Sequence, residues 1–593
     1  MTRAYYYTAA QIAKTEAIVC DQARALNDPD RYMRRAARAV ASAVHRYHEA
    51  HPDRNTTKET GRPTSTANTD EELGADTQVD ICALIGGGNN GGDALYACAY
   101  LAEQGYRVTA IEFTGHSHQR ARKHAESVGV TLIPANMNEW QFPQKEISDN
   151  TTKETDDFRK EHTHISHCTV RKVFPDHIQV ALRASIWIDG ILGAGLRGPI
   201  RKPLAYAISA MRIYATQHRP HIVAVDTPSG LYSGYQIEHD PILPANHTIA
   251  MIGARQEIIE PPTCYYAGSL EIANLGIKEP EEKCGEIIGP FHAYHALRIP
   301  RYDDHKYTRG VVSLIAGSNS YPGAGILAVS GAIAMGAGMV RLDSTERVQN
   351  LTLQRFPGIV VTPGKTHALV VGPGIEDLKA ETAEKIPQAT LNGISIVIDA
   401  GALDYVPTLN EHVQKKTQEK LWVLTPHAGE AARLLRAYGY QWTSTDVTHS
   451  PVKAAQYLSE CTQAAVVMKG AATVIVIPGN RPAIVPQGTG WMACAGSGDV
   501  LAGMIGAALA AASSHQDMPH SLPVPLQHTP AVPGKNRWTQ EHAHAVYGAV
   551  WLHMQSGRRI SERLGKYGGP IRPEQIAEYV PELLGEILGM TIP

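Results

Sequence analysis

Short apolar runs recur along the chain, and each ends in Gly, Asp or Pro before a helix-like pattern begins. They lie in the segments VDICALIGGGNN, ASIWIDGILGAG, HIVAVDTPSG, GVVSLIAGS, HALVVGPG, ISIVIDAGAL and LWVLTPHAGE. Apolar runs without alternation are typical of parallel strands covered on both faces, and functional residues then follow the carboxyl ends of the strands. The pattern predicts an α/β protein built on open, mostly parallel sheets.

The length of 593 residues exceeds what a single hydrophobic core usually supports, so we predict two domains. The polar stretch 278–305 separates the first three runs from the last four, which places the boundary near residue 295. We assign residues 1–290 to the first domain and 295–593 to the second. The polar, low-complexity stretches 53–77, 144–171 and 513–538 are interpreted as surface insertions.

Composition favours chemistry on small molecules. Charged residues make up 19% of the chain and the formal net charge is -3, so no basic excess indicates nucleic acid. The eight cysteines form no CxxC pair, and the N-terminus lacks the apolar core of a signal peptide. No uninterrupted apolar stretch approaches the roughly 20 residues of a membrane span. We therefore expect a soluble, cytoplasmic protein without a nucleic-acid or membrane partner.

The segment CAGSGDVLAG, residues 494–503, carries the clearest chemistry. A glycine-rich turn enters a helix of small residues, and Asp499 lies at the start of that helix. Backbone N–H groups at a helix N-terminus bind anions, and a carboxylate beside the anion can take a proton from a hydroxyl. The pairing indicates chemistry on a phosphate and a hydroxyl together.

Further strand ends in the second domain offer groups for the same cleft. They are the glycine-rich segment 317–338, GPG at 372–374, TPHAGE at 425–430 and KGAAT at 469–473. Each has an ordinary structural interpretation alone, as a turn or strand end. Their recurrence at one structural position favours the functional interpretation.

In the first domain, three strand ends present oxygen atoms. GGGNNGGDA at 86–94 follows one strand, Asp189 ends a second, and Asp226 with Ser229 follows a third in the turn DTPSG. The glycine pattern is not GxGxxG, so a plain dinucleotide-binding interpretation is weak. Oxygen-only ligands suit a hard cation.

Read in order, HKYTRG, GAG, VVGPG, VIDAG, LTPHAGE, VVMKGAAT and AGSGDVLAG make the second domain similar to the ADP-dependent NAD(P)H-hydrate dehydratases of the ribokinase-like superfamily. The resemblance implies that Asp499 is the catalytic acid/base. It implies nucleotide binding by Lys469, Gly470, Ala471, Ala472, Thr473 and Gly498, and contact with the hydrated substrate by Ala324, Gly374, His427 and Asp499.

The NNGGD loop, the Asp-x-x-x-Gly loop and the DxPSG turn make the first domain resemble the NAD(P)H-hydrate epimerases. The resemblance implies a potassium ion held by Asn90, Asp189 and Ser229, with Asp189 also the catalytic acid/base. The residues implied to contact the hydrated nucleotide are Asn89, Asn90, Gly91, Gly92, Asp93, Gly193, Ala194, Gly195, Leu196, Arg197, Gly198, Pro199 and Asp226.

Together the two resemblances imply a Rossmann-like three-layer α/β/α domain followed by a ribokinase-like α/β/α domain. They imply a bifunctional enzyme that repairs NADHX and NADPHX, in which the nicotinamide ring has gained a hydroxyl at C6. The first domain interconverts the R and S hydrates, and the second dehydrates the S form with ADP as phosphoryl donor, which yields NAD(P)H, AMP and phosphate. Potassium is the expected ion, magnesium remains open as a second ion, and we expect a homo-oligomer.

Several positions depart from the family pattern. Ala94 replaces a glycine after NNGGD, and RYMRRAARAV replaces an apolar stretch, which leaves open any subunit contact of that helix. Before Asp499, Trp491, Cys494 and Ala495 replace the usual residues, so the anion site loses a hydroxyl.

Other interpretations remain. The second domain alone would serve a ribokinase-like small-molecule kinase with a non-catalytic N-terminal binding domain, which the fused NNGGD domain disfavours. Related first domains also act as RNA-processing scaffolds, but here Asn90, Asp189 and Ser229 are all present. A transition-metal site formed by His162, His164, His167 and Cys168 is possible by spacing, and a solvated loop is the favoured interpretation.

Overall fold

The computed structural model describes residues 3–51, 81–140, 173–193, 195–232, 241–297, 299–416, 420–486, 488–514, 538–565 and 568–590. The insertions predicted at 53–77 and 144–171 lie outside these ranges, as do almost all of 513–538, Ala194 and the histidine-rich segment at 162–168.

The chain divides into two compact units, which confirms the two-domain α/β prediction. The N-terminal unit comprises Tyr6–Ile259 and Thr263–Lys283, and the C-terminal unit comprises Cys284–Pro593 with Met1–Tyr5 and Glu260–Pro262. The division falls at Cys284 instead of near residue 295. The reason is that the strand Gly285–Ile287 pairs with Ala483–Val485, far along the C-terminal unit.

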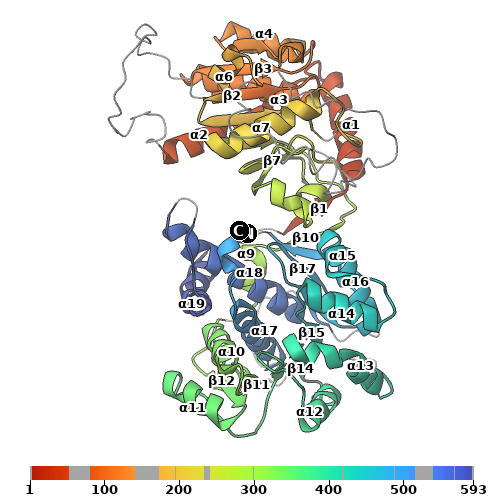
Figure 1. Ribbon diagram of the computed structural model, residues 1–593, viewed down its shortest axis with the longest axis vertical. Helices are drawn as coiled ribbons and strands as arrows, with labels where there is room; N and C mark the ends of the chain where they lie inside the picture. The colour runs from red at the N-terminus through yellow and green to blue at the C-terminus, as the bar shows by residue number, and fades with distance from the viewer. Residues whose placement is uncertain are drawn as a thin grey trace. The chain divides into compact units, whose positions relative to one another are not determined.

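The N-terminal unit is built on a parallel sheet. Its elements are β1 (Ala4–Tyr7), α1 (Ala9–Ala25), α2 (Arg31–Ala50), β2 (Ile81–Ile85), α3 (Asn89–Glu103), β3 (Val108–Glu112), α4 (Gln119–Ser127), β4 (Thr131–Pro134), η2 (Met137–Glu139), α6 (Asp176–Leu182), β5 (Ile186–Gly190), α7 (Leu204–His218), β6 (His221–Val225), β7 (His247–Met251), β8 (Ala254–Arg255), α8 (Gln256–Ile259), η4 (Thr263–Tyr266) and β9 (Ser269–Ala273). The strand order is β4-β3-β2-β5-β6-β7-β9, with every neighbouring pair parallel. Figure 1 shows β2 and β3 of this sheet with helix α3 packed beside them.

The strand order of this sheet reverses between β2 and β5. In open α/β sheets, ligands bind in the crevice at the carboxyl ends of the two strands where the order reverses. The loop after β2 begins α3 with Asn89 and Asn90, and Asp189 lies at the end of β5. The fold therefore brings two of the predicted motifs to one point.

The C-terminal unit contains a second, longer sheet. Its elements are β10 (Gly285–Ile287), α9 (Pro290–His295), β11 (Val311–Ile315), α10 (Pro322–Ala334), β12 (Met339–Asp343), α11 (Glu346–Arg355), β13 (Ala368–Val371), α12 (Ala380–Leu391), β14 (Ser395–Ile398), η5 (Ala400–Tyr405), α13 (Val406–Gln414), β15 (Trp422–Leu424), α14 (Ala428–Ala437), α15 (Ser444–His449), α16 (Pro451–Thr462), β16 (Ala465–Met468), β17 (Thr473–Val476), β18 (Ala483–Val485), η6 (Gly490–Met492), α17 (Ser497–Ser514), α18 (Gln540–Arg563) and α19 (Pro573–Gly589). The strands follow the order β12-β11-β13-β14-β15-β16-β17-β18-β10, and the sheet continues to β1, whose residues Ala4 and Tyr5 belong to this unit.

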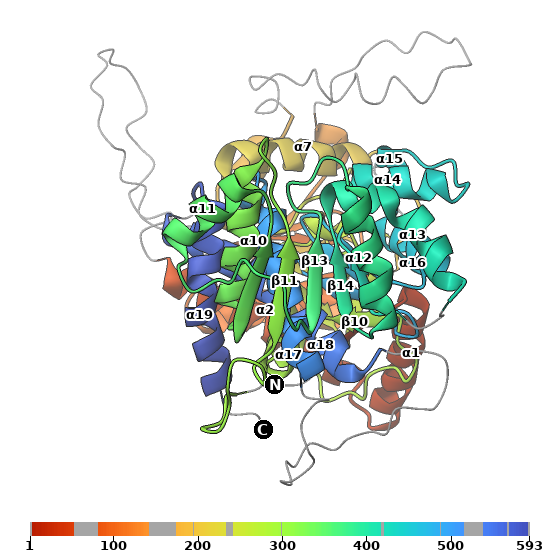
Figure 2. The ribbon, with the colours of Figure 1, turned by 90° about the horizontal axis from the view of Figure 1, so that it is seen from below.

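Pairing in this sheet is parallel from β12 to β16, and β17 is antiparallel to both of its neighbours. Figure 2 shows β11, β13 and β14 side by side, and α17 packs against these three strands. All seven apolar runs identified in the sequence are strands, namely β2, β5, β6, β11, β13, β14 and β15.

Helix α17 has the length and apolar character of a membrane span, and 78% of it is buried inside the structure, which identifies it as a core helix. Its small residues allow close approach to α10. A Cβ at Gly503 would overlap the backbone oxygen of Ala328, and a Cβ at Gly331 would overlap that of Val500. The two helix backbones are therefore in direct contact, and this contact fixes the position of the N-terminal turn of α17.

We expect Gly503→Ala to lower the melting temperature of the protein, because the added methyl group must push α17 and α10 apart. A thermal melt followed by circular dichroism measures the change. Gly585→Ala is the matched control, since a Cβ there meets nothing within 4 Å on helix α19. The control should melt at the same temperature or higher, and equal melting of both variants would contradict the close contact.

Candidate functional site

Asp189 is the centre of the site in the N-terminal unit. Its side chain is fully buried, and its oxygens accept hydrogen bonds from Ser229 N–H (2.7 Å), Ser229 Oγ (2.5 Å) and Ile191 N–H (3.3 Å). Burial raises the pKa of Asp189 to about 6, and the bonds from Ser229 and Ile191 oppose that rise. A carboxyl group with this pKa can both hold and release a proton near neutral pH.

Asn90 and Ser229 converge on the same place through Leu192. Asn90 Nδ2 donates to the carbonyl oxygen of Leu192 (3.0 Å), and Leu192 N–H donates to Ser229 Oγ (2.9 Å). A Cβ on Gly193 would lie 2.8 Å from Asn90 Cγ, so this glycine makes room for the amide. The predicted ion ligands are therefore neighbours in space.

The glycines of the NNGGD loop serve packing. A Cβ on Gly91 would overlap the carbonyl oxygen of Gly86, and one on Gly92 would lie 2.8 Å from Met33 Sδ. Asn89 is exposed, with its Nδ2 3.4 Å from Glu16 Oε1. Packing against neighbouring atoms therefore requires glycine at both positions.

The residues after Gly193 form a loop at the carboxyl edge of β5. Gly195 and Arg197 are exposed, Gly198 adopts a φ of 117°, and Leu196 N–H donates to the carbonyl oxygen of Gly193 (3.1 Å). Pro199 is exposed, and Ala194 lies outside the described residues.

Asp93 and Asp226 add two carboxyl groups at this end of the sheet. Burial, reinforced by the charges of Asp226 and Glu16, raises the pKa of Asp93 well above its usual range. Asp226 forms an ion pair with Arg255, with Asp226 Oδ2 2.7 Å from Nη2. The first site thus combines buried acid groups with hydroxyl, amide and carbonyl oxygens.

Within the described residues no group of three or more His, Cys, Asp or Glu side chains could hold a metal ion. The donors around Asp189 are of another kind, because one carboxylate is joined by amide, hydroxyl and carbonyl oxygens. Such a neutral-rich oxygen set fits a hard cation of low charge.

Asp499 occupies the first turn of α17 in the C-terminal unit. The preceding Gly496 has a φ of 93°, a conformation that favours glycine and turns the chain into the helix. Among the described residues no acceptor binds the N–H groups of Gly498 and Asp499. Burial, reinforced by the charge of Asp399, raises the pKa of Asp499 to about 7, and Lys469 opposes the rise.

Lys469 lies beside this turn, and its ammonium group is held by two carboxylates. A Cβ on Gly498 would lie 3.4 Å from Lys469 Nζ. The same Nζ is 2.8 Å from Asp399 Oδ1 and 3.9 Å from Glu430 Oε2. Burial alone would lower the pKa of Lys469, but Asp399 and Glu430 outweigh it and raise the pKa. The ammonium group is therefore charged and fixed beside the open N–H groups.

Asp399 is the residue that sequence reasoning missed. Its carboxylate is 2% exposed and also accepts a hydrogen bond from Thr425 Oγ1 (2.7 Å). The available signal was its place in VIDAG directly after β14, at the same edge as the other predicted residues.

The residues expected to line the hydrated substrate come from three further strand ends. Gly374, with a φ of 66°, packs against Ala324 in the first turn of α10, where a Cβ would lie 2.5 Å from that of Ala324. His427 caps α14, because its Nδ1 accepts from Gly429 N–H (3.0 Å) and Glu430 N–H (3.3 Å). Its side chain is 56% exposed. The cap is a structural role that sequence reasoning did not assign.

The KGAAT segment begins with Lys469 and ends with Thr473, the first residue of β17. Thr473 is buried at the start of that strand, Ala472 is buried, and Gly470 is exposed. Ala471 accepts a hydrogen bond from Gly488 N–H (3.0 Å).

The structure shows the surroundings of three residues that depart from the family pattern. Ala94 is buried, and its Cβ lies 2.5 Å from where Gly190 would carry one. Trp491 is 44% exposed and approaches Gly568, and burial raises the pKa of Cys494. The thiol is therefore a neutral group next to the anion-binding turn.

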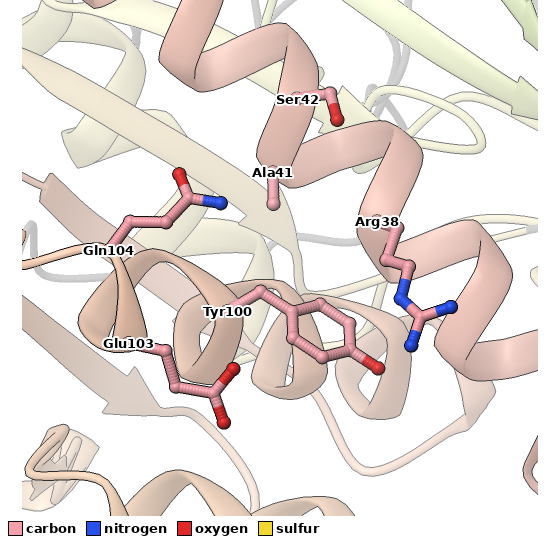
Figure 3. Close-up of a pocket in the computed structure, with 6 residues that line it drawn as sticks. All are labelled: Arg38, Ala41, Ser42, Tyr100, Glu103 and Gln104. Carbon is pink, nitrogen blue, oxygen red and sulfur yellow. The ribbon is translucent and has the colours of Figure 1, made fainter.

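A cavity of about 320 Å³ lies between α2 and α3, outside the residues predicted for either site (Figure 3). Its lining residues are Arg38, Ala41, Ser42, Tyr100, Glu103 and Gln104. The guanidinium carbon of Arg38 is 5.3 Å from the centre of the Tyr100 ring. In α2 both valines and most of the alanines are buried, and Arg38 is exposed, so the basic stretch still packs as an amphipathic helix.

Comparison with known proteins places each unit. Residues 312–582 match the family described as NAD(P)H-hydrate dehydratase, and residues 29–256 match the family described as YjeF-related protein N-terminus. A bifunctional NAD(P)H-hydrate repair enzyme of Mycobacterium leprae is 30% identical over 439 residues, which cover 73% of this chain and 78% of that protein. Its namesake in Mycobacterium tuberculosis (strain H37Rv) is 29% identical over 438 residues, which cover 72% of this chain and 78% of that protein.

Among solved structures, the ADP/ATP-dependent NAD(P)H-hydrate dehydratase of Bacillus subtilis, co-crystallised with ATP and Mg²⁺, is 23% identical. The likeness covers 50% of this chain and 97% of that chain, with a TM-score of 0.40.

We expect Asp499→Asn to stabilise the protein at pH 8. The pKa of Asp499 is about 7 in the folded protein and about 4 in the unfolded chain, so ionisation favours the unfolded chain. The resulting loss of folding stability grows as the pH rises from about 4 to about 7 and is complete above pH 7. The amide removes this cost, so the melting temperature should rise by about 2–4 °C for each kcal/mol gained. The difference from wild type should vanish near pH 4. Asp303→Asn, at an exposed carboxyl, should not change the melting temperature, and a lower melting temperature for Asp499→Asn at pH 8 would refute the interpretation.

Proposed function

The chain belongs to the family of bifunctional NAD(P)H-hydrate repair enzymes, and we propose how its two sites divide that repair. The enzyme repairs hydrated NADH and NADPH through an epimerase activity and a dehydratase activity. We assign epimerisation of the R and S hydrates to the N-terminal unit and dehydration of the S hydrate to the C-terminal unit. The two units are taken as the structure divides them, between Lys283 and Cys284.

The observation that carries the dehydratase assignment is the arrangement around Asp499. A half-buried carboxyl with a pKa of about 7, two open N–H groups and a fixed ammonium group lie at one helix N-terminus. Phosphoryl transfer needs these three elements, namely a base for the attacking hydroxyl, donors for the developing negative charge and a cation beside the phosphates.

In the proposed reaction Asp499 takes the proton of the C6 hydroxyl, whose oxygen attacks the terminal phosphorus of ADP, and AMP leaves. The lone pair of the ring nitrogen then expels phosphate from C6, and loss of a proton from C5 restores the dihydropyridine. The N–H groups of Gly498 and Asp499 hold the transferring phosphoryl group. Lys469 binds the nucleotide phosphates, and Asp399 with Glu430 keeps its Nζ in place.

The substrate and nucleotide contacts complete this site. Ala324, Gly374 and His427 contact the hydrated substrate, while residues 469–473 and Gly498 bind the nucleotide. ADP is the proposed donor, and magnesium remains open as a second ion.

We expect kcat/KM for dehydration of the S hydrate to rise with pH up to about 7 and then level off. The base must be ionised, and burial holds the pKa of Asp499 at about 7, so the rate should fall about tenfold for each pH unit below it. Asp499→Asn should lose roughly 10²- to 10⁴-fold in turnover, measured as NADH formed at 340 nm. Near-normal turnover of that variant would remove Asp499 from the reaction.

The epimerase assignment rests on the buried Asp189 and its oxygen-rich neighbours. When the C6 hydroxyl departs as water, the ring nitrogen stabilises the cation left at C6, and water returns on the opposite face. Asp189 would donate the proton to the departing hydroxyl and accept one from the incoming water. Asp93 and Asp226, with the loops 89–93 and 193–199, would contact the nucleotide.

The donor set around Asp189 fits potassium, as the mixed amide, hydroxyl and carboxylate oxygens indicate. Asn90, Asp189 and Ser229 would hold the ion. When bound, it supplies positive charge that stabilises the ionised form of the buried carboxyl. No other residue assignment depends on it.

We expect Asp189→Asn to abolish epimerisation of the R hydrate above the rate in buffer, because the amide cannot exchange a proton with the hydroxyl. NMR of the isolated R hydrate measures the loss. Dehydration of the S hydrate with ADP by the same variant should match wild type, which controls for the C-terminal unit, and an unchanged circular dichroism spectrum controls for folding of the N-terminal unit. Equilibration of the two hydrates at the wild-type rate would refute the role of Asp189.

We further propose a cytoplasmic homo-oligomer that acts on NADHX and NADPHX. A kinase activity is the alternative for the second site, and it predicts a stable phosphorylated product in place of free phosphate.

A further inference from the structure

Asp226 is held in an unusual backbone conformation immediately after β6. Its φ is 66°, in the left-handed region that a residue with a side chain rarely adopts. Such a conformation is unfavourable for a residue that carries a side chain, and it persists only where the surrounding structure imposes it, most often at functional sites. The contacts that impose it here come from one short segment, β7 to β8.

Four atoms of Asp226 are in contact with this segment, two of its backbone and two of its carboxylate. Asp226 N–H donates to the carbonyl oxygen of Ile249 (2.8 Å), and Asp226 Oδ1 accepts from Met251 N–H (3.1 Å). Arg255 Nη2 makes the other two contacts, with Asp226 Oδ2 at 2.7 Å and with the carbonyl oxygen of Asp226 at 3.2 Å. One guanidinium nitrogen therefore fixes both the backbone and the carboxylate.

Arg255 itself is almost completely desolvated. It is 1% exposed, and its second charged neighbour is Glu257, whose Oε1 is 3.4 Å from Nε. Its Nη1 has no hydrogen-bond acceptor among the described residues. Burying a guanidinium with donors left unsatisfied is costly, and apolar side chains would fill the same space at lower cost. The stability of the fold alone does not account for an arginine here.

We propose that Arg255 is a positioning residue of the epimerase site, which holds the Asp226 carboxylate in the orientation that binds the hydrated nucleotide. The inference rests on the proposed function of the N-terminal unit. A carboxylate held in this way accepts hydrogen bonds from hydroxyl groups, which a hydrated nucleotide carries on its riboses and at C6. Arg255 acts through Asp226 and makes no contact with the substrate.

The test compares Arg255→Lys, Asp226→Asn and the double variant in the full-length protein, with isolated R hydrate as the probe. Lysine keeps the charge but cannot contact the carboxylate and the carbonyl oxygen with guanidinium geometry. We expect Arg255→Lys to raise KM for epimerisation about tenfold, the usual effect of losing a hydrogen bond to a charged group, with kcat little changed. The double variant should have the KM of Asp226→Asn alone, because the arginine then has nothing to position.

Two results would overturn the inference. One is a wild-type KM for Arg255→Lys, and the other is a double variant whose KM is the product of the two single effects. A wild-type protein that fails to epimerise the hydrate would instead contradict the proposed function itself, so the two failures are distinguishable.

Controls separate positioning from folding. Arg212→Lys makes the same exchange at an exposed residue of α7 and should leave KM unchanged. A thermal melt followed by circular dichroism reports whether the N-terminal unit of each variant is folded, and dehydration of the S hydrate with ADP reports on the C-terminal unit. If Arg255→Lys does not fold, a double variant with Arg255→Met and Asp226→Asn, which carries neither charge, takes its place. Its KM should equal that of Asp226→Asn alone. A higher KM would overturn the inference.

Discussion

Both sites depend on a carboxyl group that is withdrawn from water at the carboxyl edge of a sheet, fully buried in the case of Asp189 and half-buried in the case of Asp499. A carboxylate loses much of its hydration there, so its proton is held more tightly unless a partner compensates. Asp189 accepts hydrogen bonds from its neighbours, which oppose the effect of burial, and its pKa is raised to about 6. At Asp499 the charge of Asp399 adds to the effect of burial and the charge of Lys469 opposes it, and the pKa is raised to about 7. The fold thus brings two acid/base groups into the range where they can exchange protons at neutral pH.

Neighbouring residues hold these functional groups in position. In the C-terminal unit, the direct backbone contact of α17 with α10 holds the first turn of α17, and Lys469 is held against that turn by Asp399. In the N-terminal unit, Arg255 plays the corresponding part for Asp226. Lys469 and Asp226 therefore each depend on a charged partner, Asp399 and Arg255 respectively, that makes no proposed contact with substrate.

The strands and the motif positions could be predicted from the sequence because both are local patterns. An apolar run followed by Gly or Asp marks a parallel strand and its functional edge, and all seven such runs are strands. The antiparallel β17 could not be predicted in this way, because its direction is set by pairing with β16 and β18. The boundary was displaced for a similar reason, since β10 pairs with β18 across almost 200 residues.

Side-chain partners were the least accessible to sequence reasoning. Lys469 was identified as a cation after a strand, but nothing local shows that Asp399, 70 residues earlier, binds it. The Asp226 partner Arg255 appears in sequence only as a charge at the end of an apolar stretch. The roles of the individual site residues, and the potassium, magnesium and ADP assignments, remain predictions.

Recovery of NADH from the pure R hydrate tests the central claim most directly, because it requires both sites of one chain to act in sequence. The R and S hydrates are supplied separately with ADP, with ATP or with no nucleotide. We predict that both hydrates yield NADH with ADP and that neither does without nucleotide. Recovery from the S hydrate alone would contradict an active epimerase site, and a stable phosphorylated product from both would contradict the dehydratase and favour a kinase.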